Sequence, residues 1–136
     1  MDEAQPVITQ EGLYTNGWND EIHGEVYWRT LFSAGRSPTK NLTAGMAEIP
    51  PGREFKAHRH KQTEIYHITG GNGEITIDGF VQKVAPGCAV YIPGNAVHCL
   101  KNTGTEPLRF FYTFAADSIE EVKYHFIAEH DAGEAL

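Results

Sequence analysis

The chain has 136 residues, of which 40% are hydrophobic and 21% charged, as expected for a single globular domain that buries its own core. Its formal net charge of −7 argues against a nucleic-acid-binding surface, which would be basic. The two cysteines do not form a CxxC pair, so we expect free thiols and a reducing cytoplasm. The acidic N-terminus has no apolar stretch behind it and no run reaches the length of a membrane span, so we expect neither a signal peptide nor a membrane segment.

Short β-type runs follow one another along the chain, separated by Gly, Pro, Asn and Asp. Even spacing of this kind predicts an all-β sandwich or barrel. The Asp78-Gly79 pair between two such runs predicts a two-residue hairpin. Ser118 and Glu121 form a capping-box pattern that predicts one short helical turn. The expected strands are, in chain order, 7–9 (an edge strand), 25–32, 42–49, 63–69, 74–78, 80–84, 88–92, 97–101 and 108–115.

Two histidines, His58 and His60, are separated by a single residue. A strand rises about 3.3 Å per residue and alternates its faces, so both imidazoles project to one side about 6.6 Å apart along the backbone. Glu64 would lie roughly 20 Å from His58 on a straight strand, so the chain has to turn at 61–63 and begin a new strand. On that strand Glu64 and Tyr66 share a face.

A fourth candidate ligand, His98, follows the turn Pro93-Gly94-Asn95 and comes from a different hairpin. Three imidazoles and one carboxylate suit one divalent Fe, Mn, Ni, Co, Cu or Zn ion and leave coordination positions for water or substrate. The simpler interpretation is a cluster of ordinary surface histidines, which an HxH pattern alone does not exclude.

The spacing of these residues resembles the two motifs of the cupin family. The first motif is matched at every position by Gly52-x5-His58-x-His60-x3-Glu64-x6-Gly71. The second is matched by Gly87-x5-Pro93-x-Asn95-x2-His98-x3-Asn102, except that Asn95 stands where glycine is usual. Asparagine tolerates positive φ better than most residues, so we expect the turn to be kept.

The resemblance implies a double-stranded β-helix (jelly-roll) barrel, usually dimeric, with inward-facing metal ligands His58, His60, Glu64 and His98. We expect one cupin domain over 1–136, with a barrel core at about 25–127 and motifs at 52–71 and 87–102. Cupins include many kinds of enzyme as well as binding modules, so the fold does not select the chemistry.

A closer resemblance is to the small cupin lyases that cleave dimethylsulfoniopropionate to acrylate and dimethyl sulfide. It is carried by the runs 64–66, 90–102 and 121–124. The resemblance implies that the substrate carboxylate binds the metal, that Tyr66 removes the neighbouring proton and that Tyr124 lines the pocket. A nearby cation can lower the pKa of a phenol from its usual value of about 10 and make it a base. The alternative is that Tyr66 is simply a barrel-lining aromatic residue.

Other aromatic residues are candidates for the substrate pocket. Tyr112 and Phe114 lie on one face of the last long strand and could hold a cation by their ring faces, although core packing is the default interpretation. Met46 is a further pocket candidate. Trp18 and Trp28 are expected in the core or at an interface. The remaining histidines, His23, His67, His125 and His130, are expected to face solvent.

The sequence leaves three functions open for a small-molecule substrate or ligand. The first is a metal-dependent carbon–sulfur lyase with Tyr66 as base. The second is an Fe(II)-dependent cupin dioxygenase, and the third is a sensor or ligand-binding cupin without turnover. A metal-independent sugar epimerase would not need four ligands. We expect a homodimer and neither nucleic-acid nor membrane partners.

Overall fold

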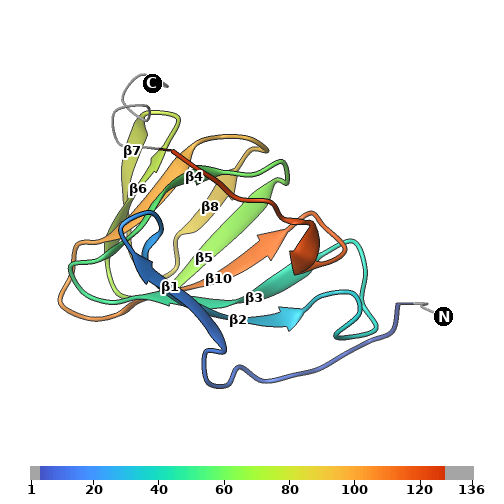
Figure 1. Cartoon of the computed structure of the whole chain (residues 1–136). Helices are drawn as coiled ribbons and strands as arrows, with labels where there is room; N and C mark the ends of the chain where they lie inside the picture. Colours follow the sequence, from blue (N-terminus) through green and yellow to red (C-terminus); the bar gives the residue numbers. More distant parts are fainter. Residues whose placement is uncertain (1–3, 128–136) are drawn as a thin grey trace.

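The computed structural model describes residues 4–127, and its strands form one antiparallel sheet that curls into a barrel (Figure 1). The path through the sheet is β7-β6-β9-β4-β2-β3-β10-β5-β8, with β1 added to β2 and β11 added to β4. The strands are β1 Asn16–Asp20, β2 Gly24–Phe32, β3 Thr43–Ile49, β4 Glu54–Arg59, β5 Glu64–Gly70, β6 Gly73–Ile77, β7 Phe80–Val84, β8 Ala89–Ile92, β9 His98–Asn102, β10 Leu108–Phe114 and β11 His125–Phe126, with a 3-10 turn, η1, at Ile119–Glu121.

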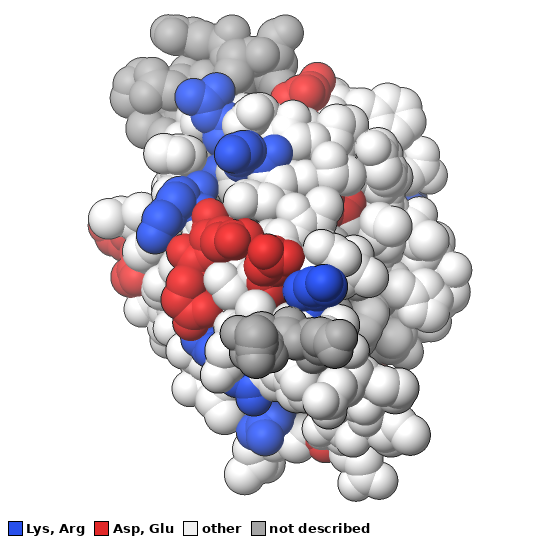
Figure 2. Space-filling model, turned by 90° about the vertical axis from the view of Figure 1, so that its right-hand side faces the viewer, with Lys and Arg blue, Asp and Glu red and all other residues white. Residues whose placement is uncertain are grey.

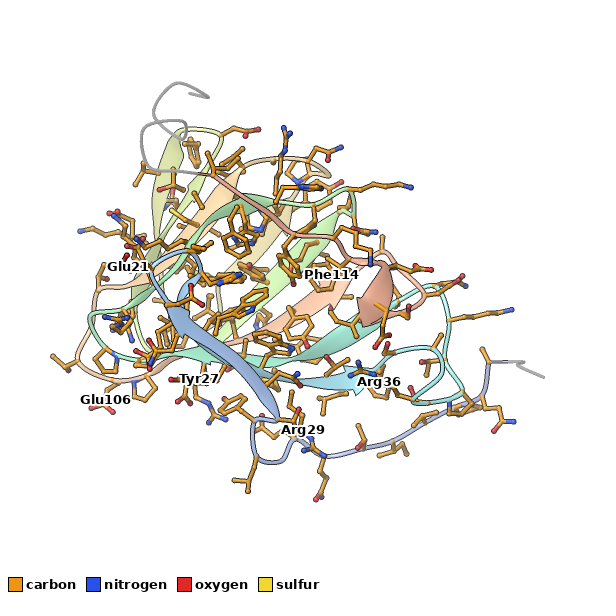
Figure 3. The ribbon with its side chains drawn as sticks, in the orientation of Figure 1. Glu21, Tyr27, Arg29, Arg36, Glu106 and Phe114 are labelled. Carbon is orange, nitrogen blue, oxygen red and sulfur yellow. The ribbon has the colours of Figure 1, made fainter. Side chains whose placement is uncertain are left out.

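Alternation of buried and exposed residues along the strands produces the barrel interior. In β5 and β10 every second side chain is buried, so each of these strands has one face in the core and one face outside. Tyr66 and Phe110 pack ring to ring inside, with centroids 4.6 Å apart. Figure 3 shows Phe114 inside the barrel among other rings, whereas Glu21 and Glu106 lie at its periphery. The predicted all-β barrel is therefore confirmed.

Two of the predicted turns have the backbone conformation that their residues suggest. Asp78 and Gly79 both have positive φ, at 45° and 85°, and join β6 to β7 as a two-residue hairpin. Asn95 has a φ of 67°, so the asparagine in the second motif keeps the turn that glycine would make.

Three expectations about local structure were wrong. Residues 7–9 form no strand, and the first strand is instead β1, which pairs with β2. Ser118 makes no side-chain cap to η1; the carboxylate of Glu121 accepts the backbone N–H of Asp117 instead. His23 does not simply face solvent, because its ring stacks on Trp18 with centroids 4.3 Å apart. His130 lies outside the described residues.

Residues 117–127, which we call the C-terminal strap, cross in front of the sheet from η1 to β4 (Figure 1). Backbone hydrogen bonds tie the two ends: Ala34 N–H donates to Asp117 O, and Ile127 N–H donates to Ala57 O. The strap places Tyr124 and Phe126 against the barrel interior. It therefore forms a wall over one end of the barrel.

The surface around η1 is acidic. Figure 2 shows acidic side chains gathered on this face of the molecule with basic side chains around them. Glu120 of η1 forms an ion pair with Arg36, and both side chains are more than half exposed. None of the helical segments in residues 4–127 has the length and apolarity needed to span a bilayer.

Candidate metal centre and adjoining cavity

Three strands bring the four predicted ligands together. His58 lies in β4 and pairs across the sheet with His98, the first residue of β9. His60 directly follows β4, and Glu64 begins β5 after the expected turn at 61–63. One nitrogen from each of the three imidazoles lies within 4.8 Å of the others, in a group that could hold a metal ion. The Glu64 carboxylate approaches the same group, with Oε1 lying 3.0 Å from His60 Nε2 and 3.5 Å from His98 Nε2.

The backbone fixes the tautomer of each imidazole. The Nδ1 atoms of His58, His60 and His98 lie 2.6, 3.0 and 2.9 Å from the carbonyl oxygens of residues 56, 62 and 96, respectively. Because a carbonyl oxygen can only accept, each Nδ1 carries the proton and each Nε2 presents a lone pair. This is the arrangement of a metal-ligating histidine.

The atoms of this cluster fit a bound cation. The Nε2 atoms of His58 and His98 are buried and have no hydrogen-bond partner among the described residues. Glu64 is only 3% exposed, and the described part of the chain places no lysine or arginine against it. Buried lone pairs and a buried carboxylate are costly without compensation, and a divalent cation would satisfy them. Burial also lowers the pKa of His58 well below its ordinary value, with the neighbouring His98 adding to the effect, so its imidazole is neutral.

Two tyrosines, one buried and one partly buried, flank the cluster from opposite elements. Tyr66 comes from β5, and its ring centroid lies 6.2 Å from that of His98. Tyr124 comes from the C-terminal strap, and its ring lies 5.5 Å from both His58 and His60. Burial, followed by the negative charge of Glu64, raises the pKa of both phenols well above their ordinary value. In the metal-free protein both are therefore protonated at neutral pH.

An apolar cavity of about 90 Å³ adjoins the cluster and shares Glu64 with it. No lysine or arginine contributes to its lining within residues 4–127, and Glu64 supplies the only charge. Eight aromatic side chains dominate the walls. They are Trp18, Trp28, Phe55, Tyr66, Phe110, Tyr112, Phe114 and Tyr124. Such a cavity favours an apolar or cationic guest over an anionic one.

The hydroxyl of Tyr112 is turned away from the cluster and lies 2.9 Å from Thr30 Oγ1. It occupies space above Gly45, where any Cβ would collide with it and with the carbonyl oxygen of Arg29. Burial raises the pKa of Tyr112 to about 12. This phenol therefore has a structural role and lines the cavity by its ring.

The structure corrects one predicted pocket residue and adds others. Met46 does not line the cavity; it pairs with Arg29 and Phe111 on the outer side of β3, and the adjacent Ala47 lines the cavity instead. Tyr112 and Phe114 do line it. Sequence reasoning missed Trp18, Trp28 and Phe55. No sequence motif marks Trp18 as a cavity residue. Trp28 lies two residues after Val26 on the same expected strand, so strand parity would have placed both side chains on one face.

Comparison with known proteins gives a consistent result. Residues 45–114 match the family model of the Cupin domain. The chain is 40% identical over 121 residues to dimethylsulfoniopropionate lyase DddW of Ruegeria pomeroyi, covering 89% of this chain and 79% of the relative. It is 33% identical over 103 residues to 5-nitrosalicylic acid 1,2-dioxygenase of a Bradyrhizobium species, covering 75% of this chain and 46% of the relative. A cupin 2 conserved barrel domain protein from Rhodopseudomonas palustris has a similar fold, with a TM-score of 0.72, 18% identity and coverage of 90% and 80%.

Proposed function

The chain belongs to the cupin family, and on that basis we propose that it is a metal-dependent lyase that cleaves dimethylsulfoniopropionate to acrylate and dimethyl sulfide. The observation that carries the proposal is an aromatic cavity without a cationic side chain among the described residues, placed directly beside a buried set of candidate metal ligands. The 40% identity to a lyase of this activity over most of both chains supports it.

His58, His60, His98 and Glu64 would hold one divalent Fe, Mn, Ni, Co, Cu or Zn ion. When bound, such an ion would take the substrate carboxylate, acidify the adjacent carbon and lower the pKa of a neighbouring phenol. The substrate carboxylate would then lie at the metal and the rest of the substrate in the cavity. The cavity lining agrees with this placement, because it offers a carboxylate no positive partner.

The sulfonium end of the substrate suits the aromatic walls. A cation over the face of an aromatic ring gains about 0.5–2 kcal/mol, more when it is desolvated. Trp18 and Trp28 line the cavity and lie close together, with ring centroids 4.9 Å apart. The Glu64 carboxylate adds a negative charge at the same cavity. The walls would therefore bind the cation and exclude water from the reacting carbon.

Tyr66 is the proposed base. As the phenolate, its Oη takes the proton from the carbon beside the substrate carboxylate and becomes a neutral phenol. The electron pair left on that carbon forms the double bond of acrylate, and the carbon–sulfur bond breaks with its pair going to sulfur. Neutral dimethyl sulfide leaves. Tyr124, whose ring lies on the strap side of the imidazoles, would position the substrate and close the site.

The test is dimethyl sulfide and acrylate release by protein reconstituted with each candidate metal. Tyr66→Phe should lower kcat by about 10²–10⁴-fold, the usual contribution of a general base, with metal content unchanged. Tyr124→Phe should mainly raise KM. If the two variants exchange these effects, Tyr124 is the base. If no metal supports release of dimethyl sulfide, the lyase proposal is wrong.

A dioxygenase is the second candidate, because the chain also resembles a nitrosalicylate dioxygenase. The chain spans less than half of that relative, which weakens the comparison. A lyase needs no oxygen, whereas a dioxygenase consumes it. Oxygen uptake with a chelating phenol, together with loss of activity in an anaerobic assay, would favour this second function. Tight ligand binding without turnover would instead favour a sensor.

We also propose a cytoplasmic location and a homodimer. Cys88 and Cys99 are both free thiols, which fits a reducing compartment. The dimer is supported by exposed apolar side chains on the outer face of neighbouring strands, with Ile65 of β5 45% exposed and Tyr91 of β8 64% exposed. Neighbouring exposed apolar side chains of this kind are found at protein–protein contacts.

A further inference from the structure

The cavity is small enough to distinguish alkyl groups by length. Its volume is about 90 Å³. A dry protein cavity of about 150 Å³ holds benzene, which corresponds to roughly 25 Å³ per non-hydrogen atom. By that measure this cavity has room for about three or four such atoms. A dimethylsulfonio group has three, and a diethylsulfonio group has five.

Ala47 is the smallest side chain that lines the cavity and is 3% exposed. Its register partners are Trp28 on β2 and Phe110 on β10, and the rings of both also line the cavity. The Ala47 methyl group therefore lies between two large rings on the cavity wall, and atoms added to it would reduce the space in the cavity. Two residues earlier on the same strand, the space above Gly45 is already filled by the Tyr112 hydroxyl.

We propose that Ala47 is a specificity-determining residue that limits the alkyl groups on the sulfonium centre to methyl. The inference rests on the proposed function for the identity of the substrate. The size limit itself depends only on the cavity. A single methylene in an apolar pocket changes kcat/KM by about 10–200-fold, so one methyl group at position 47 is enough to set such a limit.

The experiment compares kcat/KM for dimethyl- and diethylsulfoniopropionate in metal-loaded protein. The wild type should prefer the dimethyl compound by at least about tenfold. Ala47→Gly should raise the diethyl-to-dimethyl ratio by about tenfold or more, and Ala47→Val should lower kcat/KM for the dimethyl compound by a similar factor. Ala44→Gly and Ala44→Val are matched controls, because Ala44 is buried in the same strand but borders a separate hollow with Phe111 and Thr113.

A second readout does not depend on the reaction. Trimethylsulfonium, with four non-hydrogen atoms, and ethyldimethylsulfonium, with five, are titrated into metal-free wild-type protein and both Ala47 variants, with binding followed by calorimetry. The wild type should bind only the trimethyl ion, and Ala47→Gly should bind both. Size-selective binding without dimethyl sulfide release would disprove the proposed function and leave the size limit intact.

Thermal unfolding checks that Ala47→Val is folded, and Ala47→Gly tests the limit in the opposite direction. The inference is overturned if the wild type binds both ions equally. It is also overturned if the wild type releases dimethyl sulfide but the substrate ratio is the same in Ala47→Gly as in the Ala44 controls.

Discussion

At the scale of single residues, each imidazole of the cluster is oriented by backbone only two positions away. His58 and His98 donate from Nδ1 to the carbonyl two residues before them, and His60 donates to the carbonyl two residues after it. No distant side chain is needed to hold these rings. The local strand and turn conformations therefore orient the rings, and the long-range packing has only to bring the strands together.

The raised pKa of Tyr112 predicts how the free energy of unfolding changes at alkaline pH. A tyrosine in the unfolded chain loses its proton near pH 10, whereas folded Tyr112 keeps it up to about pH 12. Between these values the unfolded state binds fewer protons, so the free energy of unfolding falls as pH rises, by up to about 3 kcal/mol. Below pH 10 this stabilisation is complete.

Urea unfolding at pH 9 and pH 11.5 would measure the effect. Tyr112→Phe should show a smaller loss of stability between the two pH values than the wild type. Tyr91→Phe is the control, since Tyr91 is 64% exposed and should leave the wild-type loss unchanged. Equal losses in the wild type and Tyr112→Phe would contradict the prediction.

Residue patterns predicted the grouping of the four candidate ligands better than the lining of the cavity. Strand parity correctly placed Glu64 and Tyr66 on one inward face, because β5 alternates regularly between buried and exposed residues. The same reasoning failed for Met46, because β3 is buried on both faces and both Met46 and Ala47 are apolar. Trp18 could not be assigned either, since its place depends on how β1 and the C-terminal strap pack together.

At the scale of elements, the C-terminal strap completes the site that the barrel leaves open. Its residues Ile119 and Tyr124 line the cavity, and Phe126 pairs with His58 across β11 and β4. Beyond the short β11 pairing, scattered hydrogen bonds and one ion pair tie the strap to the barrel. One hydrogen bond has a buried acceptor residue: Ile119 N–H donates to Ser33 Oγ at 2.9 Å, and Ser33 is 1% exposed.

Ser33→Ala should loosen the strap. The Ile119 N–H would lose its acceptor, which costs about 1–2 kcal/mol locally. Hydrogen exchange at Ile119 should accelerate about 5–30-fold, while amides in β5 should be less affected. Ser118→Ala is the matched control, because the Ser118 side chain makes no cap hydrogen bond and its loss should change little. Equal exchange in the two variants would show that Ser33 does not hold the strap.

At the scale of the whole molecule, the two outer faces of the barrel differ in character. Across β4, β9, β6 and β7 one outer row alternates in charge, with Glu54, Lys101, Glu74 and Lys83 in register. Across β10, β5 and β8 two adjacent outer rows are uncharged. They consist of Phe111, His67 and Ala89 in one row and Thr113, Ile65 and Tyr91 in the next. The first face is suited to solvent exposure, and the second is suited to contact with another protein surface.

A second copy of the chain is the partner that best fits the uncharged face. Two molecules with a net charge of −7 repel each other, and contact through an uncharged patch keeps that repulsion smallest. A two-fold contact would place the same residues of both copies near the axis. We therefore expect light scattering to give a mass twice the 15.1 kDa of one chain.

Tyr91→Lys combined with Ile65→Lys should convert this dimer to a monomer, because two-fold symmetry would bring four buried ammonium groups together. Ile22→Lys is the control: Ile22 is 66% exposed in the turn between β1 and β2, outside the rows that contain Ile65 and Tyr91, and its replacement should leave the dimer intact. A wild-type mass of one chain, or a dimer that survives the double substitution, would show that this face is not the interface. The four candidate ligands are buried in the barrel interior and belong to neither outer row, so the monomeric variant should keep its affinity for the metal.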